Sequence, residues 1–135
     1  MEIHARTRQV RMSPRKVRLI AGLVRNMDAR AALDQLKFTA KAACRPIEKT
    51  LRSALANADH NFHIDAEDLK IKKIFVDKGT VLKRWRARAF GRAAPIKKHL
   101  CHITIVLDTK EAAVSQSSPK KKEARHKNQT RAQKK

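Results

Sequence analysis

Glycine, cysteine and acidic residues are scarce in this chain, and each shortage excludes a class of protein. Three glycines among 135 residues leave no glycine-rich loop of the kind that cradles nucleotide phosphates. The two cysteines, Cys44 and Cys101, are far apart in different kinds of segment, which indicates free thiols in a reducing compartment. Because there is no long apolar run and no basic helix with an apolar face, we expect no membrane partner. No apolar signal-peptide core follows Met1, so we expect no cleaved targeting segment.

Basic residues dominate what is present. Lysine and arginine number 33 against 12 acidic residues, which gives a formal net charge of +21 and a sequence pI near 11.0. A surface with this charge repels itself unless a polyanion neutralises it. The composition therefore predicts a nucleic-acid partner, and an anionic membrane surface is the less supported alternative.

Three segments have the patterns of strands. Residues 2–10 alternate between apolar and basic side chains, which predicts a strand with one basic face and a distant pairing partner. Residues 69–80 become apolar on both faces around Phe75, as in a strand that is buried on both sides. Residues 99–108 place four apolar side chains on one face: Cys101, Ile103, Ile105 and Leu107.

Three other segments have helical periodicity. They cover residues 13–26, 28–38 and about 39–61, and Ser13 and Asp28 are suitable caps for the first two. Pro46 lies inside the third, so that helix either bends there or has its regular part from Arg45 onward. The polar and acidic stretch 57–68 predicts a loop. We therefore expect an α+β fold in one domain, since the length allows a modest core.

The start of the first helix has an unusual charge. Arg15 and Lys16 put positive charge at the positive end of the helix dipole, at a cost of ~0.3–1 kcal/mol each. Either exposed charges tolerate this cost, or a phosphate bound at the helix N-terminus reverses its sign. The overall charge favours the phosphate.

The segment "LKRWRARAFGRAAPIKK" at residues 82–98 has seven basic residues, no acid and two large aromatic residues, Trp85 and Phe90. It is too long for an ordinary hairpin loop, so we expect both flanking strands to continue as a ribbon that turns near Phe90 and Gly91. Such a ribbon is marginally stable in water. RNA would suit it, because arginines pair with phosphates and aromatic rings stack on unpaired bases. A mobile arm that binds DNA or a membrane is the alternative.

Nothing in the sequence predicts an enzyme, a metal site or a cofactor. His99, Cys101 and His102 are close in sequence, but no second ligand pair has zinc-site spacing. We expect Cys101 to fill the core. An architectural DNA-binding protein with a basic arm and an RNA-processing enzyme remain as alternatives. The first would insert an apolar wedge at its tip, and the second would need an acid–base or metal constellation.

Four stretches together carry a resemblance: "SPRKVRLIAGLVR", "SALANADHN", "IFVDKGTVLKRWRARAFGRA" and "CHITIV". With them the chain, over about residues 3–107, resembles the bacterial-type large-subunit ribosomal protein L-twenty-two family. The resemblance implies three helices on a three-stranded antiparallel sheet, with a long protruding β-hairpin at about residues 78–99 within a body of residues 1–111. It also implies a structural, non-enzymatic protein that binds large-subunit rRNA, aids its assembly and lines the nascent-peptide exit tunnel. Residues 112–135 have no periodicity and predict a disordered basic tail.

The resemblance and the charge pattern together give a set of expected contacts. On the body we expect seven cations to hold rRNA phosphates: Arg6, Arg8, Arg11, Arg15, Lys16, Arg18 and Arg25. On the hairpin we expect seven more: Lys83, Arg84, Arg86, Arg88, Arg92, Lys97 and Lys98. The residues expected at the tip and tunnel wall are Trp85, Ala87, Arg88, Ala89, Phe90, Gly91 and Arg92, and Ala87 replaces a proline usual in the family. Expected partners are rRNA, neighbouring ribosomal proteins and the nascent peptide in a bacterial cytoplasm, with no cofactor, membrane or stable homo-oligomer.

Overall fold

The computed structural model describes residues 2–110, and the predicted tail at residues 112–135 lies outside this part of the chain. Three antiparallel strands form one sheet in the order β1-β3-β2. Their bounds are Glu2–Val10 (β1), Leu69–Ala87 (β2) and Ala93–Thr109 (β3). The predicted α+β fold is confirmed, and the distant partner of the first strand is β3.

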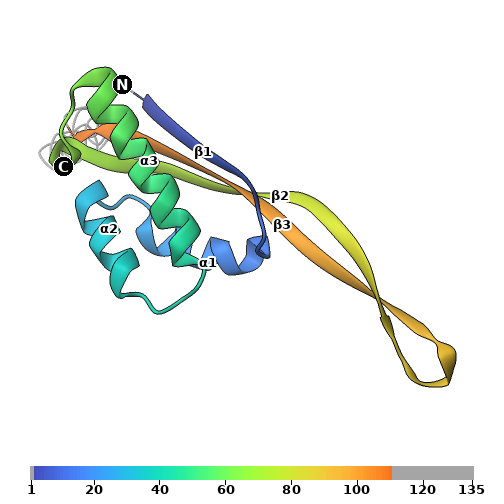
Figure 1. Cartoon of the computed structure of the whole chain (residues 1–135). Coiled ribbons are helices and arrows are strands. Elements are labelled where there is room, and N and C mark those ends of the chain that lie inside the picture. Colours follow the sequence, from blue (N-terminus) through green and yellow to red (C-terminus); the bar gives the residue numbers. More distant parts are fainter. Residues whose placement is uncertain (1, 111–135) are drawn as a thin grey trace, which may run out of the picture.

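Three helices cover one face of the sheet (Figure 1): α1 (Pro14–Val24), α2 (Ala29–Phe38) and α3 (Cys44–Phe62). Each turns an apolar stripe inward, and the largest fully buried side chains include Ile47 and Leu51 of α3. Burying a side chain of this size stabilises the fold by roughly 1.5–3 kcal/mol. The buried Thr50 hydroxyl donates to the carbonyl of Pro46 and meets the Thr7 hydroxyl of β1, both at 2.8 Å. This polar group is thus satisfied inside the core.

α3 begins at Cys44, close to the start at Arg45 that was one of the two alternatives, and it ends at Phe62, close to the predicted end near residue 61. The stretch 57–68 was also expected to form a loop, and its first six residues are instead helical. Pro46 therefore falls in the first turn, where no intrahelical N–H partner is needed, and the helix has no reason to bend. At the other end His63 adopts a left-handed conformation with φ of 54°, and its N–H bonds the carbonyls of Ala58 and Asp59. This C-cap ends the helix despite its polar sequence.

The expectation of a strand buried on both sides was wrong. Phe75 of β2 is 48% exposed, while its neighbours Ile74 and Val76 are buried. The helices pack on one face of the sheet only, so the side chain that points to the other face remains in solvent.

The hairpin is a continuation of β2 and β3 beyond the helices (Figure 1). The two strands pair antiparallel along their whole length, from Leu69 opposite Thr109 to Ala87 opposite Ala93. The register shifts near Lys72 and near Gly79. A side chain at Gly79 would put its Cβ 3.1 Å from the backbone of Leu100, a tight contact that glycine avoids at this register shift. At the tip Phe90 and Gly91 have φ of 58° and 65°. The predicted turn position is confirmed.

Candidate nucleic-acid interface

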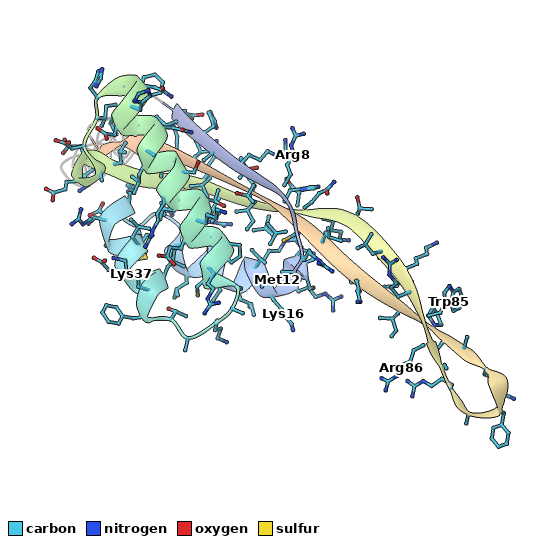
Figure 2. The ribbon with its side chains drawn as sticks, in the orientation of Figure 1. Arg8, Met12, Lys16, Lys37, Trp85 and Arg86 are labelled. Atoms are coloured by element: carbon cyan, nitrogen blue, oxygen red, sulfur yellow. The ribbon has the colours of Figure 1, made fainter. Side chains whose placement is uncertain are left out.

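The cations predicted on the body come from β1 and α1. Ile3 and Ala5 of β1 are buried, so the alternation of the strand exposes Arg6 and Arg8. Arg8 and Lys16 project from opposite sides of the body in Figure 2. The body cations therefore do not form a single patch, and only part of the set can face one surface.

The first turn of α1 is positively charged and open. Ser13 occupies the N-cap position but its side chain makes no capping bond, and Pro14 takes the first helical position. The first turn contains no acidic residue, and Arg15 and Lys16 are exposed. The unfavourable charge at this helix end is therefore not offset by a neighbouring acid in the first turn. A phosphate at this position remains a prediction.

Arg18 has a structural partner. Its guanidinium donates from Nε and Nη2 to the carbonyl of Val76, at 3.1 and 2.8 Å. No local pattern indicates this bond, because the two residues are 58 positions apart. β2 is an edge strand of the sheet, and this fork ties α1 to it just before the hairpin leaves the body. Phosphate binding by Arg18 remains a prediction, and the bond to Val76 gives the residue a role without RNA.

All seven hairpin cations are exposed. The ladder places Lys83 opposite Lys97, and like charges directly opposite one another destabilise a sheet. Trp85 is 71% exposed and projects from the opposite side of the ribbon to Arg86 (Figure 2). Both faces of the hairpin thus carry cations, as expected from strand alternation.

The hairpin charge has no internal compensation in the described part of the chain. In that part of the chain, the lysine and arginine side chains that form ion pairs all lie outside the hairpin: Lys37, Arg52, Lys72 and Lys110. Among residues 2–110, none of the seven hairpin cations has an ion pair.

The tip combines exposure with an uncommon backbone. Phe90 is 98% exposed, and its left-handed φ is costly for a bulky residue. The N–H of Arg88 donates to the carbonyl of Arg92 at 2.8 Å and closes the turn. An apolar ring held out in this way has no packing partner within the body.

A groove lies at the base of the hairpin. It brings together Arg11 and Lys16 of the body set with Lys97 and Lys98 of the hairpin set. It also includes Lys41, which is in neither predicted set of cations. No local pattern could have identified Lys41, since its position depends on how α2 joins α3.

A cluster of paired charges lies at the other end of the sheet. Lys72 Nζ contacts Glu2 Oε1 and Asp108 Oδ2, each at 2.8 Å. The hydrogen bond from Lys72 holds the pKa of each carboxyl below its ordinary value, and the bonds to Asp108 and Glu2 raise the pKa of Lys72. These ion pairs connect the start of β1 with the start of β2 and the end of β3.

Cys101 and His102 of β3 both have contacts within the protein. Cys101 is fully buried, as predicted, and burial raises the pKa of its thiol. His102 Nδ1 accepts the N–H of Gln9 at 3.0 Å. Within residues 2–110 no group of three or more His, Cys, Asp or Glu side chains could hold a metal ion. In the same part of the chain no helix is long and apolar enough to cross a membrane.

Comparison with known proteins agrees with the resemblance. The family model described as "Ribosomal protein L22p/L17e" matches residues 5–108. The large ribosomal subunit protein uL22 of Syntrophobacter fumaroxidans (strain DSM 10017 / MPOB) is 54% identical over 110 residues, which cover 82% of this chain and 100% of that protein. The protein of the same name from Synechococcus sp. (strain JA-3-3Ab) is 51% identical over 106 residues, 78% of this chain and 86% of that protein.

Proposed function

This chain belongs to the ribosomal protein L22p/L17e family, and from that premise we propose that it is a structural, rRNA-binding component of the large ribosomal subunit. Both relatives compared above are named as large-subunit proteins. The proposed role includes assembly of the rRNA and lining of the nascent-peptide tunnel by the hairpin. The proposal includes no catalytic activity, and it assigns the protein to a bacterial cytoplasmic ribosome.

The observation that supports this role best is the uncompensated hairpin. A two-stranded ribbon without a hydrophobic core is marginally stable in water. This one adds the opposed Lys83 and Lys97 and the exposed Trp85 and Phe90. Each of these features is unfavourable in the free protein and becomes favourable inside folded RNA, where phosphates neutralise the cations and bases stack on the ring of Trp85.

The two parts of the protein would then act differently. The body cations would hold phosphates at the surface of the rRNA, while the hairpin would pass between rRNA helices. The small side chains of Ala87, Ala89, Ala93 and Ala94 would let the hairpin backbone approach the RNA closely. At the tip, Phe90 and Gly91 would face the tunnel and the nascent peptide, and the body would contact neighbouring ribosomal proteins.

Sedimentation of tagged protein in cell lysate tests this role. After a high-salt wash we expect the protein to stay in the large-subunit peak, because a hairpin enclosed by folded rRNA cannot leave as salt weakens its phosphate contacts. A protein held by six to ten phosphate contacts alone would lose roughly 10³–10⁵-fold in affinity over a modest rise in salt. Loss into the free fractions would contradict the proposal and favour a peripheral polyanion binder.

A pair of charge reversals refines the test. Arg88→Glu changes an exposed hairpin cation next to the tip, and Lys49→Glu changes an exposed cation on α3 that belongs to neither predicted set. We expect large subunits to accumulate much less with Arg88→Glu than with Lys49→Glu. Equal accumulation would show that the hairpin charge does not contribute to assembly.

A further inference from the structure

The groove at the base of the hairpin has the size of a ligand site. It lies between the start of α1, the segment 39–43 that joins α2 to α3, and both arms of the hairpin. Its volume of about 830 Å³ is within the roughly 300–1,000 Å³ that is typical of sites for small ligands. Figure 2 shows Met12 and Lys16 at this junction, where the ribbon leaves the body.

The charge around the groove has one sign. Five cations line it, and no acidic side chain is among its described lining residues: Arg11, Lys16, Lys41, Lys97 and Lys98. None of the five forms an ion pair with another residue between positions 2 and 110. These cations come from four separate segments, so the fold has brought them together. An occupant with several negative charges would relieve their mutual repulsion.

The wall of the groove is also apolar, which phosphate binding alone would not require. Met12, Leu19, Leu82 and Leu100 line it beside the cations. Leu19 is 71% exposed on the outer side of α1. A leucine this exposed, at the edge of a cationic groove, offers a surface for a flat, uncharged group.

Backbone and side-chain polar groups are available in the same place. Ser13 lines the groove, and its side chain makes no capping bond. The pairing of β1 with β3 ends at Val10 and Cys101, so residues 97–100 of β3 have a strand partner on one side only. Free donors and acceptors on that edge could bond the polar rim of a base.

We propose that this groove binds one unpaired nucleotide of an RNA strand. The flanking phosphates contact the five cations, and the base lies against Leu19, Leu82 and Met12. The base must be unstacked to enter a concave site, which favours a single-stranded loop or bulge over a duplex. The inference rests on the proposed RNA-binding function and adds to it a contact with a base at the junction of body and hairpin.

Three probes test the groove in the full-length chain. They are the RNA tetramer of adenylate, the same ribose-phosphate chain without bases, and free adenosine 5′-monophosphate. Their dissociation constants are measured at one fixed ionic strength. We expect the tetramer with bases to bind more tightly than the abasic chain, and the mononucleotide to bind more weakly than the tetramer, because it has fewer phosphates.

Two leucines on α1 provide matched variants. Leu19→Ala removes apolar surface from the groove. Leu23→Ala makes the same substitution one turn later on α1, at a side chain that is 44% exposed and does not line the groove. We expect Leu19→Ala to weaken binding of the tetramer about threefold to tenfold and to leave the abasic chain unaffected. Leu23→Ala should leave both unchanged. Methyl chemical shifts of Leu19 and Leu82 should respond to the tetramer more than to the abasic chain.

Each contrary result has a distinct meaning. Equal affinity for the two tetramers, or equal effects of the two leucine variants, would overturn the nucleotide groove and leave a phosphate-only site. Binding of adenosine 5′-monophosphate as tightly as the tetramer would overturn the RNA-strand assignment in favour of a free nucleotide. No binding of either tetramer would instead contradict the proposed RNA-binding function itself.

Discussion

Arg18 gives the sharpest test of how this body holds the base of its hairpin. Arg18→Met keeps an unbranched, mostly aliphatic side chain and removes the two donors to the carbonyl of Val76. Hydrogen bonds from a charged donor contribute roughly 1.5–3 kcal/mol when buried. These two are part-buried and share one acceptor, so we expect a loss of about 1–2 kcal/mol in the free energy of unfolding.

Urea unfolding followed by far-UV circular dichroism measures this loss. With a slope of about 2 kcal/mol per molar urea, the midpoint should fall by roughly 0.5–1 M. Arg15→Met is the matched control, because Arg15 is exposed on the same helix and has no such bond. Its effect should stay within about 0.5 kcal/mol.

Arg18→Met should have the larger effect on stability, and Arg15→Met should have the larger effect on RNA affinity. Arg15→Met should weaken RNA binding without lowering stability, since Arg15 lies free at the positively charged start of α1. If Arg18→Met has no larger effect on the urea midpoint than Arg15→Met, the bond to Val76 does not stabilise the free protein. Arg18 would then return to the set of free cations that the sequence predicted.

Three further predictions concern the hairpin and the opposite end of the sheet. Gly79→Ala should destabilise the chain by about 1–3 kcal/mol in urea unfolding, because the new Cβ would meet the backbone of Leu100 at 3.1 Å; an unchanged midpoint would show that the bulge adapts freely. Phe90→Asn should slow hydrogen exchange of the Arg88 amide that closes the tip, since asparagine tolerates a φ of 58° better than phenylalanine; faster exchange would refute the strain. Lys72→Met should cost stability at neutral pH. The lowered pKa of Asp108 gives a contribution that is complete above the ordinary aspartate pKa and lost as pH falls below about 4. The gap between wild type and Lys72→Met should therefore narrow in acid, and a constant gap would exclude this linkage.

Local patterns predicted the parts of the fold that depend on neighbouring residues. The alternation in residues 2–10 and the stripes of α1 and α2 follow from periods of two and 3.6, which the backbone imposes on any buried face. The ribbon that turns near Phe90 and Gly91 followed from the length of residues 82–98, which are too many for an ordinary hairpin loop. Each of these features is read from one continuous stretch of sequence.

The wrong or missing predictions concern residues whose environment depends on a tertiary contact. Phe75 was expected to be buried because its neighbours are apolar, yet only the helix-facing side of the sheet is covered. Arg18 looks like any other exposed arginine until Val76 is placed beside it. Lys41 joins the groove only because the α2–α3 connection meets the hairpin base. No spacing along the chain encodes these three relationships.

The Lys72 ion pairs and the hairpin cations lie at opposite ends of the sheet, and this separates folding from binding. Lys72 pairs with Glu2 and Asp108 at the end where β1 starts and β3 stops, so that end is stabilised within the protein itself. The hairpin end has only cations without ion pairs, and their repulsion opposes the free folded state. Salt should therefore act in opposite directions on the two properties: it screens the repulsion within the free hairpin and weakens its attraction to RNA. A hairpin with internal ion pairs would be more stable alone, but those pairs would have to break before phosphates could replace them. The absence of acid from residues 82–98 thus trades stability of the free ribbon for a surface that is ready to accept RNA.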